Sequence, residues 1–220
     1  MNTSTHARRR IAATFAATFA AGLSISLASA PASAAVITFD DIDINHYYPP
    51  ITSIADGYHG FDWDNFYAIN TKHYSRQRSG YVNGTTSGTQ VGYNRKGKPA
   101  TISSSSIFDF NRAQITAAWK DDLKVTVAGL LDGQQLYSQT VQVNTAGPTL
   151  FDFDFVGIDT LLFSSKGGSH ARLGGSGQHF GIDDLVYNET AEVPEPATLG
   201  LLAAGGLGLF AGRRRRRNAA

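Results

Sequence analysis

Apolar and polar residues alternate one by one in short runs through the middle of this 220-residue chain. In the segment 150–155, aromatic residues at every second position alternate with aspartates. Because successive side chains of a strand point to opposite faces, this pattern predicts strands with one buried and one exposed face. No long segment between residues 36 and 192 has the helical period of about 3.6 residues. The chain therefore has to build its core from β-sheet.

About eight or nine such runs are separated by Gly, Asn, Asp and Ser. The predicted strands lie at 36–39, within 58–69, and at 106–110, 114–119, 123–129, 136–143, 150–155, 158–164 and 180–187. Asp132-Gly133 predicts a hairpin turn, because Gly accepts the positive φ that such turns need. This spacing favours an all-β fold for residues 35–192, an antiparallel β-sandwich of jelly-roll type, over a mixed α+β fold.

Composition excludes several kinds of site. The chain has no Cys, which rules out disulfides, thiolate metal sites and cysteine nucleophiles. The clusters Arg8–Arg10 and Arg213–Arg217 hold eight of the 19 basic residues. Residues 35–193 carry the other 11, against 17 acidic residues, so their net charge is 11 − 17 = −6. We expect no nucleic-acid partner, because neutralising phosphates needs a basic face.

An apolar segment at the N-terminus follows the cluster Arg8–Arg10. It ends in the small residues Ala32-Ser33-Ala34, a pattern that signal peptidase cleaves. We predict that residues 1–34 form a helical signal peptide, cut by signal peptidase between Ala34 and Ala35, so that the chain is exported. An uncleaved membrane anchor is the alternative.

The C-terminus combines three features in a fixed order. These are Val193-Pro194-Glu195-Pro196, an uncharged apolar stretch at 197–212, and the cluster Arg213, Arg214, Arg215, Arg216 and Arg217. A helix over the apolar stretch is about 24 Å long, against a hydrocarbon core of about 30 Å. We predict a short transmembrane helix there, with the arginine cluster as a membrane stop on the cytoplasmic side. The acidic middle then faces outward.

This tail, residues 193–217, resembles the PEP-CTERM sorting signal of Gram-negative bacteria, also known as the ice-binding protein C-terminal domain. The resemblance rests on Pro194-Glu195-Pro196, the Gly/Leu/Ala helix and the arginine cluster. It implies recognition by a membrane-embedded exosortase and cleavage near the Pro-Glu-Pro segment. The inner membrane would hold an intermediate, and the product would be released to, or attached at, a cell surface or matrix rich in exopolysaccharide.

The middle resembles bodies that often precede such tails, in four short blocks: Phe39-Asp40-Asp41, residues 60–67, residues 79–84 and residues 182–185. Bodies with these ends are similar to galactose-binding jelly rolls, which include many carbohydrate-binding modules. In that family the first and last strands lie side by side near a structural Ca²⁺. The resemblance implies Asp41 and Asp183 as the candidate Ca²⁺ ligands, and solvent-facing strand residues are the alternative.

Two further groups are candidates for glycan chemistry. Asp62 and Asp64 would share one strand face, about 7 Å apart, a separation that suits an inverting glycosidase. Tyr58, Trp63 and Tyr81 are candidates for a platform on which sugar rings stack. A polar outer strand face and a buried aromatic core are the respective structural alternatives.

Two functions follow from these patterns. The first is a non-enzymatic, exported surface or matrix protein that binds, or helps to build, extracellular polysaccharide. The second is a surface glycan hydrolase with Asp62 and Asp64 as its carboxylates. A cleft with one buried carboxylate would favour the hydrolase, because a general acid needs a raised pKa.

Overall fold

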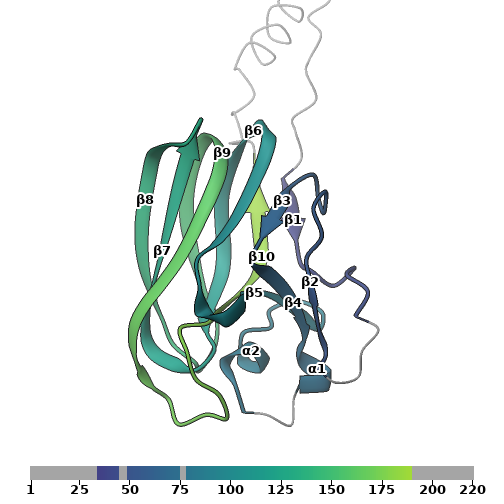
Figure 1. Ribbon diagram of the computed structural model, residues 1–220, viewed down its shortest axis with the longest axis vertical. Helices are drawn as coiled ribbons and strands as arrows, with labels where there is room; N and C mark the ends of the chain where they lie inside the picture. The colour runs from purple at the N-terminus through teal and green to yellow at the C-terminus, as the bar shows by residue number, and fades with distance from the viewer. Residues whose placement is uncertain (1–33, 45–48, 75–77, 190–220) are drawn as a thin grey trace, which may run out of the picture. The chain divides into compact units, whose positions relative to one another are not determined.

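The computed structural model describes residues 34–44, 49–74 and 78–189 (Figure 1). In chain order its elements are β1 (Ala35–Ile37), β2 (Ile51–Ser53), β3 (Asp62–Asp64), β4 (Phe66–Asn70), α1 (Thr71–Tyr74), α2 (Gly80–Asn83), β5 (Gln90–Asn94), the 3-10 helix η1 (Arg95–Gly97), β6 (Ala100–Ala117), β7 (Lys120–Leu131), β8 (Gln134–Val143), β9 (Thr149–His170) and β10 (Phe180–Tyr187). Residues 1–33 of the signal peptide predicted at 1–34, and all of the sorting tail predicted at 193–217, lie outside these ranges. Within the described ranges, no helix has the length and apolar character needed to cross a bilayer.

All strand pairs are antiparallel, and one hydrogen-bonded path runs in the order β2-β4-β5-β10-β6-β9-β7-β8. Two short strands lie off this path, since β1 pairs with β10 and β3 pairs with β6. In Figure 1 the long strands β6 to β9 run side by side, next to the group of shorter strands β2 to β5. The prediction of an all-β, antiparallel fold is confirmed.

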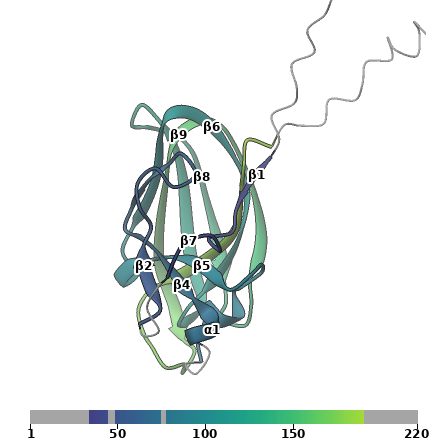
Figure 2. The same ribbon diagram turned by 90° about the vertical axis from the view of Figure 1, so that its right-hand side faces the viewer.

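The long strands β6 and β9 belong to both layers of the fold (Figure 2). Residues 100–103 of β6 pair with residues 160–163 of β9 and also with β3. After a register shift, residues 108–115 of β6 pair with the earlier part of β9 while the same region of β6 pairs with β10. Each strand therefore bends between one layer with β3, β7 and β8 and another with β10, β5, β4 and β2. The arrangement agrees with a sandwich.

These bends differ from the pattern that the sequence predicts. The separate strands expected at 106–110 and 114–119 are one strand, β6, and those at 150–155 and 158–164 are one strand, β9. The interruptions of the alternation, at residues 111–113 and at Val156-Gly157, mark irregularities of pairing within continuous strands, and not turns between strands. The structure also contains two four-residue helices, α1 and α2, that the sequence analysis does not predict.

The larger of two hydrophobic clusters lies between the two layers, and aromatic rings fill much of it. Phe66 on β4 meets Phe163 on β9 edge to face, with ring centroids 5.5 Å apart. Tyr137 on β8 stacks on Phe155 of the early part of β9 at 5.0 Å. These contacts join strands that are not neighbours in the sheet, which fixes how the two layers face each other. The largest fully buried side chains are Phe39, Phe66, Phe110, Phe163, Phe180, Ile37, Ile69, Ile102, Ile115, Leu123, Ile158 and Leu161.

The alternation within β9 places successive residues on opposite faces. Phe153 and Phe155 are buried, whereas Asp152 and Asp154 are exposed. The predicted hairpin turn at Asp132-Gly133 connects β7 and β8.

Two neighbouring residues of β9 give a test of this core. Phe163 is fully buried, and Leu162 next to it is 38% exposed. We expect Phe163→Ala to lower the free energy of unfolding by about 3–5 kcal/mol. Leu162→Ala should cost about 1 kcal/mol or less. Urea unfolding followed by the fluorescence of the two buried tryptophans measures both, and equal losses would contradict the burial pattern.

Candidate functional site

The carboxylate of Asp183, in the aspartate pair Asp183-Asp184 near the end of the domain, binds backbone N–H groups of a loop that begins at Thr86. The carboxylate of Asp183 is fully buried, and one of its oxygens accepts the backbone N–H groups of Thr86 at 2.7 Å and Ser87 at 3.1 Å. Its other oxygen accepts the N–H of Asp184 at 2.9 Å. The Ser87 hydroxyl donates to the Asp184 carboxylate at 2.7 Å. Asp183 therefore satisfies donors that a buried loop would otherwise leave unpaired.

In the pair Asp40-Asp41 near the start of the domain, Asp40 also contacts this loop. The Asp40 carboxylate accepts the N–H groups of Thr89 at 2.6 Å and Gln90 at 3.1 Å. Gly88 lies against this carboxylate with φ +48°, and a Cβ there would come within 2.0 Å of an Asp40 oxygen. The loop 86–90 thus connects the two ends of the domain, and Gly is the residue that fits at its centre.

Burial raises the pKa of Asp183 to about 6, although its hydrogen bonds from Thr86 and Ser87 act in the opposite direction. The nearby charge of Asp184 also raises it. Desolvation disfavours the charged form of the Asp183 carboxyl. The carboxyl therefore keeps its proton at a pH at which an exposed Asp has lost its proton.

The predicted Ca²⁺ ligands, Asp41 and Asp183, have different partners in the structure. The Asp41 side chain is 66% exposed, accepts the Tyr58 hydroxyl at 2.6 Å and lies 3.7 Å from His59 Nε2. Both oxygens of Asp183 are already bound to N–H donors. In the part of the chain that the structure describes, no three His, Asp or Glu residues are grouped so as to hold a metal ion. The two carboxylates do not fit a shared Ca²⁺ site.

The candidate hydrolase carboxylates, Asp62 and Asp64, lie on β3 with both side chains exposed and Trp63 buried between them. They share a strand face, as the spacing predicts. Neither is buried next to an apolar group, which is how a glycosidase raises the pKa of its general acid. The geometry therefore does not support catalysis by this pair.

The three predicted stacking residues do not form one platform. Trp63 is 6% exposed and meets Phe39 edge to face, while half-buried Tyr58 packs against the same core. Tyr81 is 3% exposed and belongs to a separate cluster, where its hydroxyl contacts His179 Nδ1 at 2.7 Å. The rings of Trp63 and Tyr81 are enclosed by other aromatic side chains, which leaves little ring surface on which a sugar could stack.

A surface pocket of about 440 Å³ lies near β3 and β4. Its lining residues are Ser53, Ile54, Trp63, Asp64, Asn65, Phe66, Tyr67, Arg95, Lys96 and Lys98. The volume is within the range of small-ligand sites, roughly 300–1,000 Å³. Three of the lining residues are cations from one short segment, 95–98, which we call the basic loop. This pocket is the candidate binding site.

Two asparagines hold the basic loop by its carbonyl groups. The Asn65 side-chain amide donates to the carbonyl oxygens of Arg95 at 3.1 Å and Pro99 at 2.9 Å. The side-chain amide of Asn94, which is fully buried, donates to the carbonyl of Lys98 at 3.0 Å. Side chains that satisfy several carbonyls at once fix the course of the loop.

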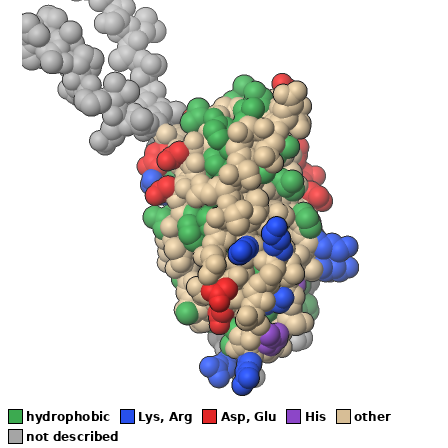
Figure 3. Space-filling model, turned by 90° about the vertical axis from the view of Figure 1, so that its left-hand side faces the viewer, with side chains coloured by type: hydrophobic (Ala, Val, Ile, Leu, Met, Phe, Trp, Pro, Cys, Tyr) green, Lys and Arg blue, Asp and Glu red, His purple; other side chains and the backbone are tan. Residues whose placement is uncertain are grey.

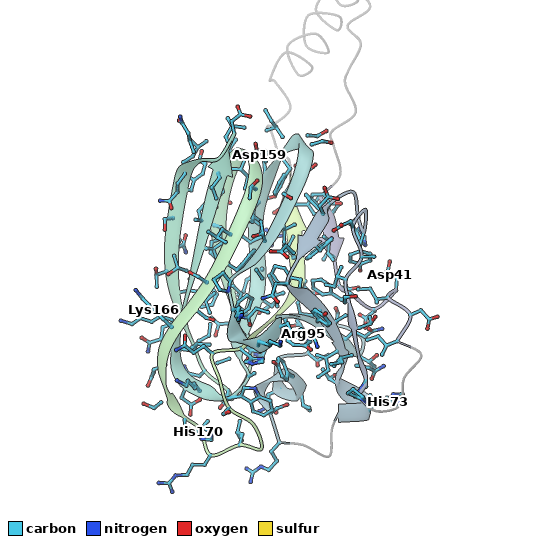
Figure 4. The ribbon with its side chains drawn as sticks, in the orientation of Figure 1. Asp41, His73, Arg95, Asp159, Lys166 and His170 are labelled. Carbon is cyan, nitrogen blue, oxygen red and sulfur yellow. The ribbon has the colours of Figure 1, made fainter. Side chains whose placement is uncertain are left out.

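Arg95 is further fixed by Tyr67. Its guanidinium lies over the tyrosine ring, 4.4 Å from the centroid, and donates to the tyrosine hydroxyl. Figure 4 labels Arg95 close to β5. A guanidinium has five donors in a planar fork, so this contact leaves others free for a ligand. The motifs in the sequence do not point to this site, although three cations within Arg95-Lys96-Gly97-Lys98 are a visible signal.

A matched pair of substitutions tests the role of Asp183. In Asp183→Asn the amide oxygen can accept from Thr86 and Ser87, but the amide NH2 group then faces the backbone N–H of Asp184, donor against donor, so we expect a loss of about 1–3 kcal/mol in the free energy of unfolding. Asp184→Asn keeps an oxygen for the Ser87 hydroxyl and should cost less than about 1 kcal/mol. Denaturant unfolding at neutral pH compares them. A loss in Asp184→Asn as large as that in Asp183→Asn would contradict the assigned contacts.

The raised pKa of Asp183 also predicts a pH dependence. The folded protein holds this proton up to about pH 6, and the unfolded chain releases it near the ordinary value of 3.8. Between these values the folded state binds more protons, so the contribution of Asp183 to stability decreases as the pH rises from about 4 to about 6. The difference in free energy of unfolding between the natural chain and Asp183→Asn, measured across this range, isolates the effect. A difference that grew with pH would contradict it.

Comparison with protein families matches residues 192–216 to the PEP-CTERM protein-sorting motif. The match confirms the resemblance of the tail. Such a motif indicates an exported protein that an exosortase processes at the membrane, as is typical of Gram-negative bacteria. The matched residues lie outside the described ranges, and no curated protein gave a match to the chain.

Comparison with solved structures found two carbohydrate-binding modules among the similar chains. One is TmCBM61 in complex with beta-1,4-galactotriose, with a TM-score of 0.36, 8% identity, and coverage of 60% of this chain and 92% of that one. The other is CBM51 from Clostridium perfringens GH95 in complex with methyl-galactose, with a TM-score of 0.34, 9% identity, and coverage of 70% and 99%. At these TM-scores the similarity supports no conclusion about a ligand.

Proposed function

We propose that the chain is a non-catalytic surface or matrix protein whose β-domain binds exopolysaccharide after export and exosortase processing. The observation that carries the proposal is the sorting motif at 192–216, which accounts for the apolar and arginine-rich tail of an otherwise acidic chain. Its partners on the route are signal peptidase, the inner membrane as a transient location, and the exosortase.

Each part of the tail has a physical role in this route. Proline disfavours helical backbone in the residue before it, so Pro194-Glu195-Pro196 presents an extended segment to the exosortase. The apolar stretch 197–212 holds the substrate in the bilayer, and the cluster Arg213–Arg217 resists transfer across it. Processing near the Pro-Glu-Pro segment would separate the domain from this membrane part.

The ends of the domain suit removal of both flanking segments. β1 begins at Ala35, the first residue after the predicted signal cleavage site, and Ala35 pairs with Tyr187 at the end of β10. Cleavage after Ala34 would therefore leave every residue of β1 in the mature chain. The two cuts would fall near neighbouring strand ends and leave the core contacts intact.

A binding role for the domain is supported by the pocket beside the basic loop, which combines polar and charged side chains with aromatic ones. Binding sites of this kind use a few polar groups to orient a ligand. The exposed positions of Asp62 and Asp64 lend no comparable support to hydrolysis. Glycan binding without catalysis is therefore the function that we propose for the domain at the cell surface or in the matrix.

Substitution of the motif tests the route. We expect replacement of Pro194, Glu195 and Pro196 by alanine to leave an unprocessed chain, longer by the tail, in the membrane fraction of the producing bacterium. The natural chain should appear shortened outside the inner membrane. Asp154→Asn, an exposed change on β9, serves as the control and should be processed normally. Mass spectrometry of the fractions measures the outcome, and an intact natural chain in the cytosol would refute the proposal.

A further inference from the structure

We propose that the pocket beside the basic loop binds the anionic groups of an acidic polysaccharide, carried on the sugars as carboxylate or sulfate. This inference rests on the proposed function, since it names the class of glycan that the domain takes. It assigns the ligand contacts to Arg95, Lys96 and Lys98, with Asp64 and Asn65 as polar partners for sugar hydroxyl groups.

The placement of charge is the first argument. Three of the 11 basic residues between positions 35 and 193 stand within the four-residue basic loop, in a segment whose net charge is −6. All three are exposed. In the described part of the chain, no carboxylate forms an ion pair with any of them. A local excess of positive charge at a pocket attracts anionic groups, and the surrounding acidic surface restricts where they bind.

The fixed backbone of the basic loop is the second argument. Lys96 has φ +57°, an uncommon conformation for a residue with a side chain. Gly97 follows with φ +62°, and a Cβ there would lie 2.8 Å from the backbone nitrogen of Gln178. Together with the asparagine contacts to the loop carbonyls, this arrangement holds the cations before any ligand arrives. A preformed site loses less entropy when it binds.

The lining of the pocket is the third argument. Tyr67 contributes a partly buried aromatic ring, and Ser53 and Asn65 contribute uncharged polar groups. Asp64, an acceptor for hydroxyl groups, lies in the same lining as the cations. A ligand that carries hydroxyl donors beside an anionic group matches this mixture. Acidic sugars have both.

Nucleic acid matches these observations less well. Proteins that bind duplexes typically neutralise about 6–10 phosphates, whereas the basic loop supplies three cations within an acidic domain. DNA also lacks the 2′-hydroxyl group on each sugar that could donate to the Asp64 carboxylate. The acidic polysaccharide is therefore the favoured class.

Two double variants with the same charge change separate site binding from bulk charge. Lys96→Gln with Lys98→Gln removes two cations from the pocket. Lys124→Gln with Lys166→Gln removes two exposed cations that are cross-strand partners on β7 and β9. Lys166 lies at the outer side of the sheet in Figure 4, and the face in Figure 3 shows largely uncharged surface between separate charged side chains.

The experiment measures dissociation constants of the full-length chain in non-ionic detergent. The probes are polygalacturonate for carboxylate, dextran sulfate for sulfate, neutral dextran and neutral galactan as uncharged glycans, and a single-stranded DNA oligonucleotide. We expect tighter binding to at least one acidic glycan than to the neutral ones. The pocket variant should weaken it about tenfold or more, and the β7–β9 variant less than about twofold. Lys96→Arg with Lys98→Arg should retain binding, and thermal melting should be the same for all variants.

Four other results would overturn either the ligand class, the pocket assignment or the proposed function. Equal weakening by both glutamine variants would show a bulk charge effect and overturn the pocket assignment. Binding to neutral glycans alone would overturn the acidic class but leave the proposed function in place. Preference for DNA over every glycan would overturn the acidic polysaccharide as the ligand. No binding to any glycan would overturn the proposed glycan-binding function itself.

Discussion

The architecture depends on two strands that each belong to both layers. β6 and β9 stay paired along most of their length, and a shift in register lets them bend around the core. This shared pair brings Phe163 on one layer against Phe66 on the other. It also provides the edges on which β3 and β10 pair. Loss of pairing between β6 and β9 would disrupt both layers at once. The core and the pocket beside β3 therefore both depend on the bend in this strand pair.

Local alternation predicted much of the fold because burial in a strand has a period of two. β10 has the bounds that the sequence analysis predicted, and Asp132-Gly133 forms the expected turn. The lengths of β6 and β9 were not predictable in the same way, since a bulge and a turn both appear in sequence as a break in the alternation of apolar and polar residues. Which one forms depends on partners far away in the chain.

The functional residues were harder to predict than the strands. The sorting tail was recognisable because its three features occur in order within one short segment. Trp63 and Tyr81 carried no signal that separates a core ring from an exposed one. Asp40 and Asp183 contact a loop between residues 86 and 90, which no local pattern connects to them, whereas Asp41 contacts Tyr58 instead. The three cations of the basic loop are visible in the sequence. The pocket beside them is not, because it depends on contacts with residues far away in the chain, such as Asn65.

The pairing of Ala35 with Tyr187 has a mechanical consequence. If the domain holds a polymer while its tail is still tethered, tension enters through the end of β10. That strand is bonded to β6 along one edge and to β1 and β5 along the other. Peeling it away would require breaking two rows of backbone hydrogen bonds together. The strand that takes this tension is therefore held along both of its edges, and the domain would resist being unfolded from its C-terminal end.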